Sequence, residues 1–124
     1  MGVSKSFTKL LVWEKAHKLV LSIYQEAKFE AKIFPKEETF GLVSQLKRAA
    51  VSIPANIAEG YKRKGIKDKI RFYNIAQSSL EEVRYYLILS KDLNYLKDES
   101  LNELLEEISK MLESYIKKIS QTSF

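Results

Sequence analysis

The chain has 124 residues, a net charge of +5 from 21 Lys and Arg against 16 Asp and Glu, and no Cys. This length fits a single domain, 1–124, and a composition of 45% hydrophobic and 30% charged residues is typical of a globular protein. The lack of Cys excludes disulfide scaffolds, thiol catalysis and Cys-ligated metal centres, and the low content of four Gly and two Pro argues against an all-β fold.

The sequence also bears on where the protein is located. No apolar run approaches the roughly 18 residues that a membrane span requires, and the N-terminal stretch MGVSKSF lacks the apolar core of a secretory signal. We therefore expect a cytoplasmic protein with no membrane partner. Met1, Gly2 and Ser6 match a myristoylation pattern that is short enough to arise by chance.

The first predicted helix spans about residues 8–32. From Leu10 onward, apolar residues recur at alternating steps of three and four, which places them on one helical face. Ser6 or Thr8 is a candidate N-cap. The helix should end before Pro35, because a residue that precedes proline is pushed out of the α region. The expected core residues of this helix are Trp13, Ala16, Val20, Ile23 and Ala27.

The second predicted helix spans about residues 39–62 and contains a proline. Pro54 removes one backbone hydrogen bond and clashes with the carbonyl of Ala50, which predicts a kink or a break. We expect a kink, because the apolar spacing resumes afterwards. Asn56 and Glu59 lie beside the proline and are expected to satisfy backbone groups that it frees. Two adjacent stripes form the expected core: Leu42, Leu46, Ala49 and Ile53, with Val43, Ala50 and Ile57.

The third and fourth predicted helices span about residues 67–93 and 98–119. Gly65 is expected to adopt left-handed geometry between the second and third helices. Asn94 is the expected stop of the third helix, and Asp98 the N-cap of the fourth. The expected core stripe of the third helix is Phe72, Ala76, Leu80, Val83 and Leu87.

Four helices of similar length joined by short connections predict an all-α fold. We expect an antiparallel up-down-up-down four-helix bundle in which helix 2 is kinked near Pro54. The third helix carries more apolar residues than one bundle needs, and the surplus either packs within the monomer or forms an interface between copies. We expect an oligomer interface made by Ile75, Tyr86, Leu89 and Leu93.

The positive charge is concentrated in one segment. Residues 61–71, YKRKGIKDKIR, hold six basic residues and one acidic residue, a surplus equal to that of the whole chain. Such a cluster suits a phosphate backbone, and Tyr61 and Tyr73 beside it are candidates for stacking on unpaired bases. The alternative is a solvated loop whose lysines serve solubility. The candidate nucleic-acid-binding residues are Lys62, Arg63, Lys64, Lys67, Lys69 and Arg71, with Lys47 and Arg48 as secondary candidates.

Known catalytic patterns are missing from the sequence. There is no P-loop and no glycine-rich dinucleotide turn. Glu14 and His17 have the spacing of a di-iron bundle site, but such a site needs two His residues and His17 is the only one. Glu81 and Glu82 are adjacent, so they point about 100° apart and do not form a facing acid pair. We therefore expect a non-enzymatic protein without catalytic residues, cofactor or metal.

Three stretches resemble one protein family. They are residues 34–64, residues 10–24 and residues 70–96, and the most specific piece is AAVSIPANIAEG, from Ala49 to Gly60. The sequence resembles bacterial four-helix-bundle proteins encoded by intervening sequences in large-subunit ribosomal RNA genes. The resemblance implies a bundle that assembles as a ring, a homopentamer, with no established enzymatic activity. It also implies kinship with the accessory variability proteins of diversity-generating retroelements, basic pentamers that bind nucleic acid and a reverse transcriptase.

Two functional hypotheses follow. In the first, a homo-oligomeric bundle binds RNA or another nucleic acid through the basic cluster. In the second, the chain is a protein-protein interaction or scaffold module with no nucleic-acid role, in which the third helix serves assembly or a partner. A reverse transcriptase is a candidate partner if the chain belongs to the retroelement branch.

Overall fold

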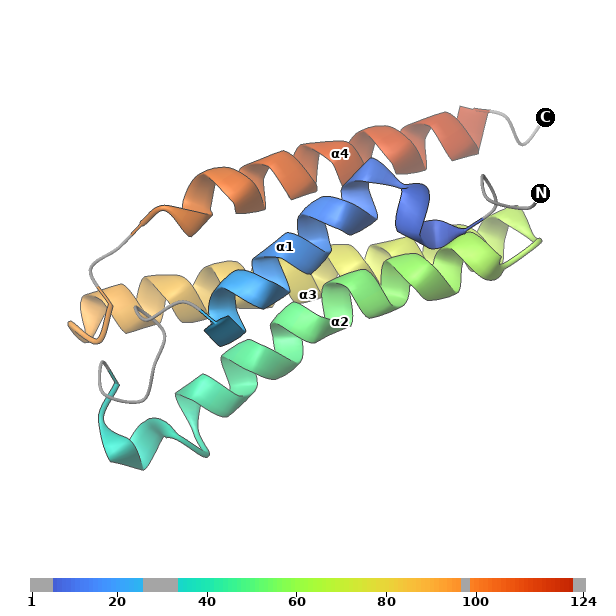
Figure 1. Cartoon of the computed structure of the whole chain (residues 1–124). Helices are drawn as coiled ribbons and strands as arrows, with labels where there is room; N and C mark the ends of the chain where they lie inside the picture. The colour runs from blue at the N-terminus through green and yellow to red at the C-terminus, as the bar shows by residue number, and fades with distance from the viewer. Residues whose placement is uncertain (1–5, 26–33, 97–98, 122–124) are drawn as a thin grey trace.

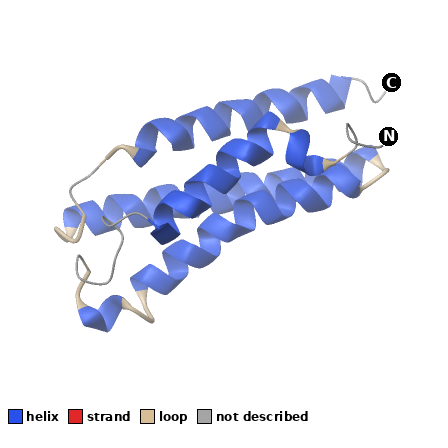
Figure 2. Cartoon of the chain, in the orientation of Figure 1, coloured by secondary structure: helices blue, strands red, loops and turns tan. Residues whose placement is uncertain are grey.

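The computed structural model describes residues 6–25, 34–96 and 99–121, and within these ranges the chain forms helices and no strand (Figure 2). The predicted all-helical fold is therefore confirmed. The four α-helices lie together in one bundle, with α2 and α3 side by side along their lengths (Figure 1). The elements are η2 Phe7–Lys9, α1 Leu11–Gln25, η4 Lys36–Glu38, α2 Leu42–Lys62, α3 Ile66–Asp92 and α4 Leu101–Gln121.

A 3-10 turn precedes α1, so α1 begins at Leu11 and not near residue 8. The Ser6 hydroxyl accepts a hydrogen bond from the Thr8 backbone N–H at 3.2 Å and caps this turn. Ala16 and Ile23 are buried as predicted, whereas Trp13 and Val20 are only partly buried and their neighbours Val12 and Leu19 are buried in their place. The predicted continuation to residue 32, including Ala27, lies outside the described residues, as do Met1 and Gly2. The buried residues of α1 are Val12, Ala16, Leu19 and Ile23.

Helix α2 also starts later than predicted. A second 3-10 turn occupies Lys36–Glu38, and the Glu38 carboxylate accepts a hydrogen bond from the Leu42 N–H at 3.1 Å. The helix passes through Pro54 without a break and is bent by 39°. A bend localised at Pro54 stays a prediction. The predicted stripes are buried except for Val43, which is partly buried.

A polar relay links α2 to α3 beside the proline. The Asn56 amide donates to the Ser52 carbonyl at 2.8 Å and to the Ser52 hydroxyl at 2.9 Å. The Ser79 hydroxyl donates to the same Ser52 hydroxyl at 2.7 Å. The amide therefore serves Ser52 rather than Ala50, whose carbonyl loses its helical partner to Pro54.

The ends of α3 differ in how well they were predicted. Gly65 has φ −77° and ψ 137°, which is ordinary extended backbone, so the predicted left-handed glycine is wrong. The connection is short because Arg63 also adopts an extended conformation at the end of α2. Asn94 has φ 63°, and its N–H donates to the Lys91 carbonyl at 2.9 Å, which confirms it as the helix stop.

Tyr73, and not Phe72, is the core aromatic of α3. Its side chain is fully buried, whereas Phe72 is half-buried. The ring of Tyr73 packs directly on Gly60, where an added Cβ would lie 2.6 Å from the ring atom Cε1. The missing side chain of Gly60 thus lets α2 and α3 approach closely. The centroid of the Tyr73 ring also lies 5.3 Å from that of Tyr115 in α4.

Helix α4 begins at Leu101 and buries Leu105, Ile108 and Leu112 against the other helices. The predicted N-cap Asp98 lies outside the described residues. The end of α4, the turn η2 and the connection between α2 and α3 lie at the same end of the bundle (Figure 1). None of the described helices combines the length and apolar character needed to cross a membrane.

Candidate nucleic-acid interface

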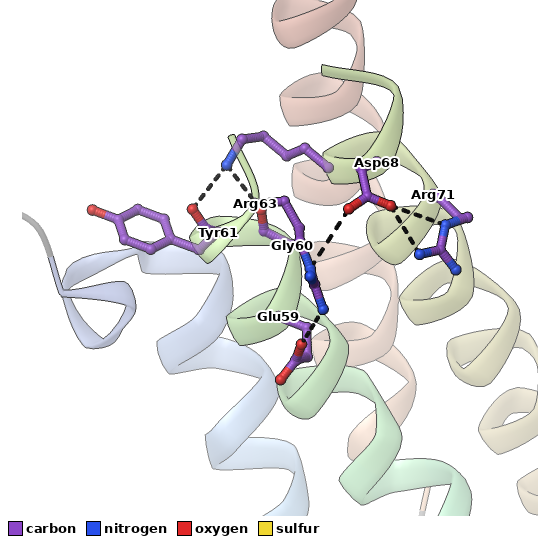
Figure 3. A network of polar contacts seen from close by, with 7 residues as sticks. Glu59, Gly60, Tyr61, Arg63, Asp68 and Arg71 are labelled. Carbon is purple, nitrogen blue, oxygen red and sulfur yellow. Dashed lines mark hydrogen bonds and ion pairs between the residues drawn. The ribbon is translucent and has the colours of Figure 1, made fainter. Parts of the chain in front are cut away.

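The connection between α2 and α3 is held by the partly buried amine of Lys69. The Lys69 ammonium, on the first turns of α3, donates hydrogen bonds of 2.8 Å to the carbonyl oxygens of Gly60 and Tyr61, two acceptors drawn in Figure 3. Carbonyls in the last turn of a helix lack the usual intrahelical partners, and a cation is favourable there. Burial lowers the pKa of Lys69. Lys69 therefore anchors the connection and does not present its charge to a ligand.

Arg63 lies between two carboxylates (Figure 3). Its Nη2 atom is 2.9 Å from Glu59 Oε1, and its Nε atom is 3.7 Å from Asp68 Oδ2. Its guanidinium carbon lies 4.6 Å from the ring centroid of Phe72. The spacing of Glu59 and Arg63 is the i,i+4 spacing at which opposite charges meet on a helix.

Arg71 binds the same aspartate from the other side. Its Nη2 and Nε atoms donate to Asp68 Oδ1 at 2.8 and 3.2 Å. Its guanidinium carbon lies 4.5 Å from the centroid of the Phe72 ring. Asp68 and Phe72 therefore each contact both Arg63 and Arg71.

The remaining three cations of the predicted cluster form what we call the lysine corner, Lys62, Lys64 and Lys67. All three are exposed, and none has an ion-pair or hydrogen-bond partner in the part of the chain that the structure describes. A lysine ammonium is a compact, mobile point charge on a long stem. The lysine corner therefore holds three exposed positive charges that no described side chain compensates.

The secondary candidates do not join this site. Arg48 is exposed on α2 but lies 14 positions before Lys62, which is about 21 Å along the helix. The Lys47 ammonium lies 4.7 Å from the ring centroid of Tyr24, so it packs on α1. Both residues lie in the first turns of α2, away from the lysine corner at its end.

Only one of the two tyrosines predicted to stack on bases is accessible. Tyr73 is fully buried, so its predicted stacking role is wrong. Its hydroxyl has no hydrogen-bond partner within 3.5 Å among the described residues, and burial together with the neighbouring Tyr115 raises its pKa. Tyr61 is half-buried, with the Lys69 ammonium 5.6 Å from its ring centroid.

Sequence reasoning missed two lysines at the same end of the bundle. Lys117 and Lys118 are exposed near the end of α4. One surface hollow is lined by Lys67, Ile70 and Ser120, which shows that this end of α4 reaches the start of α3. The fourth helix as a whole has more acidic than basic residues, so its net charge gave no indication of the two lysines near its end. The signal was the order of the helices, which brings the end of α4 to the start of α3.

His17, which has the spacing of a di-iron ligand with Glu14, lies on the surface of α1. The ring is exposed and stacks on Trp13, with centroids 4.9 Å apart. Among the described residues, no three His, Asp or Glu side chains gather in a way that could hold a metal ion.

The predicted oligomer interface is only partly exposed. Tyr86 and Leu89 are partly buried against the core, whereas Ile75 and Leu93 are exposed. The most exposed apolar side chains of α3 are Tyr85, at 57%, and Ile88, at 51%. These two residues were not predicted, and they lie on the outer face of the helix.

Comparison with known proteins places the chain in a family. No curated protein matches it. A family model described as the 23S rRNA-intervening sequence protein matches residues 8–116. That span includes all of α1, α2 and α3 and most of α4, and the chain therefore belongs to the 23S rRNA-intervening sequence protein family.

Proposed function

We propose that this protein is a non-enzymatic, homo-oligomeric four-helix bundle that binds RNA or another nucleic acid through the lysine corner. The observation that carries the proposal is that Lys62, Lys64 and Lys67 are exposed, adjacent and without an anionic partner in the described chain. The proposal keeps the up-down-up-down order of the helices and a cytoplasmic location.

The expected binding is electrostatic. Each phosphate neutralised by a lysine releases condensed counterions, so affinity falls as salt rises. Three phosphate contacts correspond to a slope of log K against log salt of about −2 for a single strand and about −3 for a duplex. Lys117 and Lys118, at the same end of the bundle, extend the surface that a strand can follow.

Assembly multiplies this site. A ring of copies, a pentamer by the resemblance, repeats the lysine corner and raises avidity without new contacts. The exposed apolar side chains of Tyr85 and Ile88 on α3 support assembly, whereas Tyr86 and Leu89 are partly buried. Sedimentation across a range of protein concentrations tests this part, and a 14.4 kDa particle throughout would refute it.

Binding is tested with a matched pair of triple variants. Lys62→Gln, Lys64→Gln and Lys67→Gln together remove three charges at the corner. The control, Lys18→Gln with Lys36→Gln and Lys110→Gln, removes three charges from exposed lysines elsewhere. Both variants have the same net charge, so a titration of labelled RNA at low salt separates the local effect from the global one. We expect the corner variant to lose most of its affinity and the control to keep it. Equal affinity of the two variants would refute the proposal.

The second candidate is a protein-interaction module, favoured by the exposed apolar side chains of Tyr85 and Ile88. A reverse transcriptase would be such a partner in the retroelement branch. Lys67→Glu discriminates the two candidates, because it should weaken RNA binding and leave binding to a protein partner on α3 intact. Charge reversal at Arg63 is unsuitable, since it would place a third carboxylate beside Glu59 and Asp68.

A further inference from the structure

We propose that Arg63 and Arg71 form a phosphate clamp that Asp68 occupies in the free protein, and that a phosphate of the bound nucleic acid takes the place of the Asp68 carboxylate. This inference rests on the proposed function, because it assigns a second element to the same binding surface. It follows from the contacts around Asp68.

The Asp68 carboxylate sits where an anion between two guanidinium groups would sit. One oxygen accepts 2.8 and 3.2 Å hydrogen bonds from Arg71, and the other lies 3.7 Å from Arg63 (Figure 3). Guanidinium groups donate hydrogen bonds to carboxylate and to phosphate oxygens alike. The arrangement that holds Asp68 is therefore also suited to a phosphate oxygen pair.

Both arginines also contact the Phe72 ring, and Arg63 has a second carboxylate partner besides Asp68. The centroid of the Phe72 ring lies within 4.6 Å of both guanidinium carbons, so both groups pack on the same ring. Arg63 is further fixed by Glu59 and by its own backbone N–H, which donates to the Gly60 carbonyl at 3.2 Å. A clamp whose arms stay in place when the carboxylate leaves loses little conformational entropy on binding a ligand.

The carboxylate itself is replaceable. Its side chain is 40% exposed, and the two arginines are 42% and 61% exposed, so an anion can reach all three groups from solvent. Exposed ion pairs contribute only about 0.2–1 kcal/mol each. A nucleic acid already held by the neighbouring lysine corner, Lys62, Lys64 and Lys67, presents phosphates at high local concentration and can displace Asp68.

The test removes the carboxylate. Asp68→Asn should raise RNA affinity about three- to tenfold, because RNA binding then no longer has to break the ion pairs of Arg63 and Arg71 with the Asp68 carboxylate. The salt slope should become steeper by about 1.4 for a single strand, which corresponds to two additional phosphate contacts. Asp92→Asn, the same change near the other end of α3, is the matched control and should change neither quantity.

A second background separates the clamp from simple repulsion between Asp68 and RNA. In a protein carrying Arg63→Gln and Arg71→Gln, Asp68→Asn removes the same negative charge but frees no guanidinium. The affinity gain and the steeper slope should disappear in this background. If Asp68→Asn raises affinity equally in both backgrounds, or in neither, the clamp is refuted. Asp68→Ser provides a second removal of the carboxylate, and thermal unfolding confirms that each variant is folded.

Two oligonucleotides identify the phosphate that is bound. With a 5′-hydroxyl strand, an affinity gain in Asp68→Asn shows that an internal phosphodiester enters the clamp. A gain restricted to the 5′-phosphorylated strand shows that the clamp takes a strand end. The lysine-corner triple variant keeps the two proposals apart: if that variant binds like its control while Asp68→Asn still shows the gain, the lysine corner fails and the clamp stands.

Discussion

Replacing Gly60 with alanine tests the packing that joins α2 to α3 beneath the candidate site. The new Cβ would lie 2.6, 2.9 and 3.1 Å from three atoms of the Tyr73 ring, whereas carbon atoms in contact lie about 3.5–4.0 Å apart. The ring must therefore move by roughly 1 Å. The ring is fully buried and also packs near Tyr115, so it has little room to move.

The magnitude follows from two opposing effects. Overpacking a core costs about 1–3 kcal/mol, and a clash with three ring atoms belongs at the upper end of that range. Alanine in a helix is more favourable than glycine by at most about 1 kcal/mol, which offsets part of the cost. We expect Gly60→Ala to lower the free energy of unfolding by about 2 kcal/mol.

Chemical denaturation followed by circular dichroism measures this loss. All variants are compared at one protein concentration, because assembly adds to apparent stability. Gly65→Ala is the matched control: Gly65 has a φ that alanine adopts freely, and nothing lies within 4 Å of its added Cβ. We expect a change within about 0.5 kcal/mol for the control. Gly60→Ala as stable as Gly65→Ala would refute the close approach of Gly60 and Tyr73.

Three further predictions concern single side chains. Tyr73→Phe removes a buried hydroxyl without a partner among the described residues and should stabilise the protein by about 1 kcal/mol in the same denaturation assay. The pKa of Tyr73 is raised in the folded state, so above the unfolded tyrosine pKa of about 10 the unfolded chain releases the hydroxyl proton more readily than the folded protein does. As the pH rises above about 10, the free energy of unfolding of the wild type should therefore fall more steeply than that of Tyr73→Phe. Lys69→Met removes the bonds to two helix-terminal carbonyls and should cost about 1–3 kcal/mol, whereas Lys67→Met should cost almost nothing; equal costs would contradict the anchoring role of Lys69. Asn94→Gly should be neutral or stabilising and Asn94→Ala destabilising by about 1 kcal/mol, because φ is 63° at this position; the reverse order would contradict the left-handed stop.

The helices were predictable because each carries a regular apolar stripe, and errors arose where local chemistry competes with that pattern. The Ser6 hydroxyl and the Glu38 carboxylate each stabilise a turn ahead of a helix, and so both helices start three residues later than predicted. Phe72 and Tyr73 are neighbours on the helix, and the apolar pattern does not decide which one is buried. The deciding feature is Gly60, which lies opposite Tyr73 on another helix.

The candidate site was predictable as a charge cluster but not as a set of roles. Its six cations look alike in sequence, and their roles depend on the path of the turn between α2 and α3. Lys69 points back to the end of α2, and two arginines share Asp68. Two of the ion pairs could have been predicted from the sequence, because Glu59 with Arg63 and Asp68 with Arg71 have the i,i+4 and i,i+3 spacings of helical ion pairs.

The salt dependence of RNA binding tests the central claim most directly. We predict that the wild-type protein gives a slope of log K against log salt that is about −2 or steeper for a single strand. Replacing Lys62, Lys64 and Lys67 with glutamine should flatten that slope by about 2, because three phosphate contacts are lost. A slope left unchanged by the three substitutions, or no binding at the lowest salt, would contradict the account.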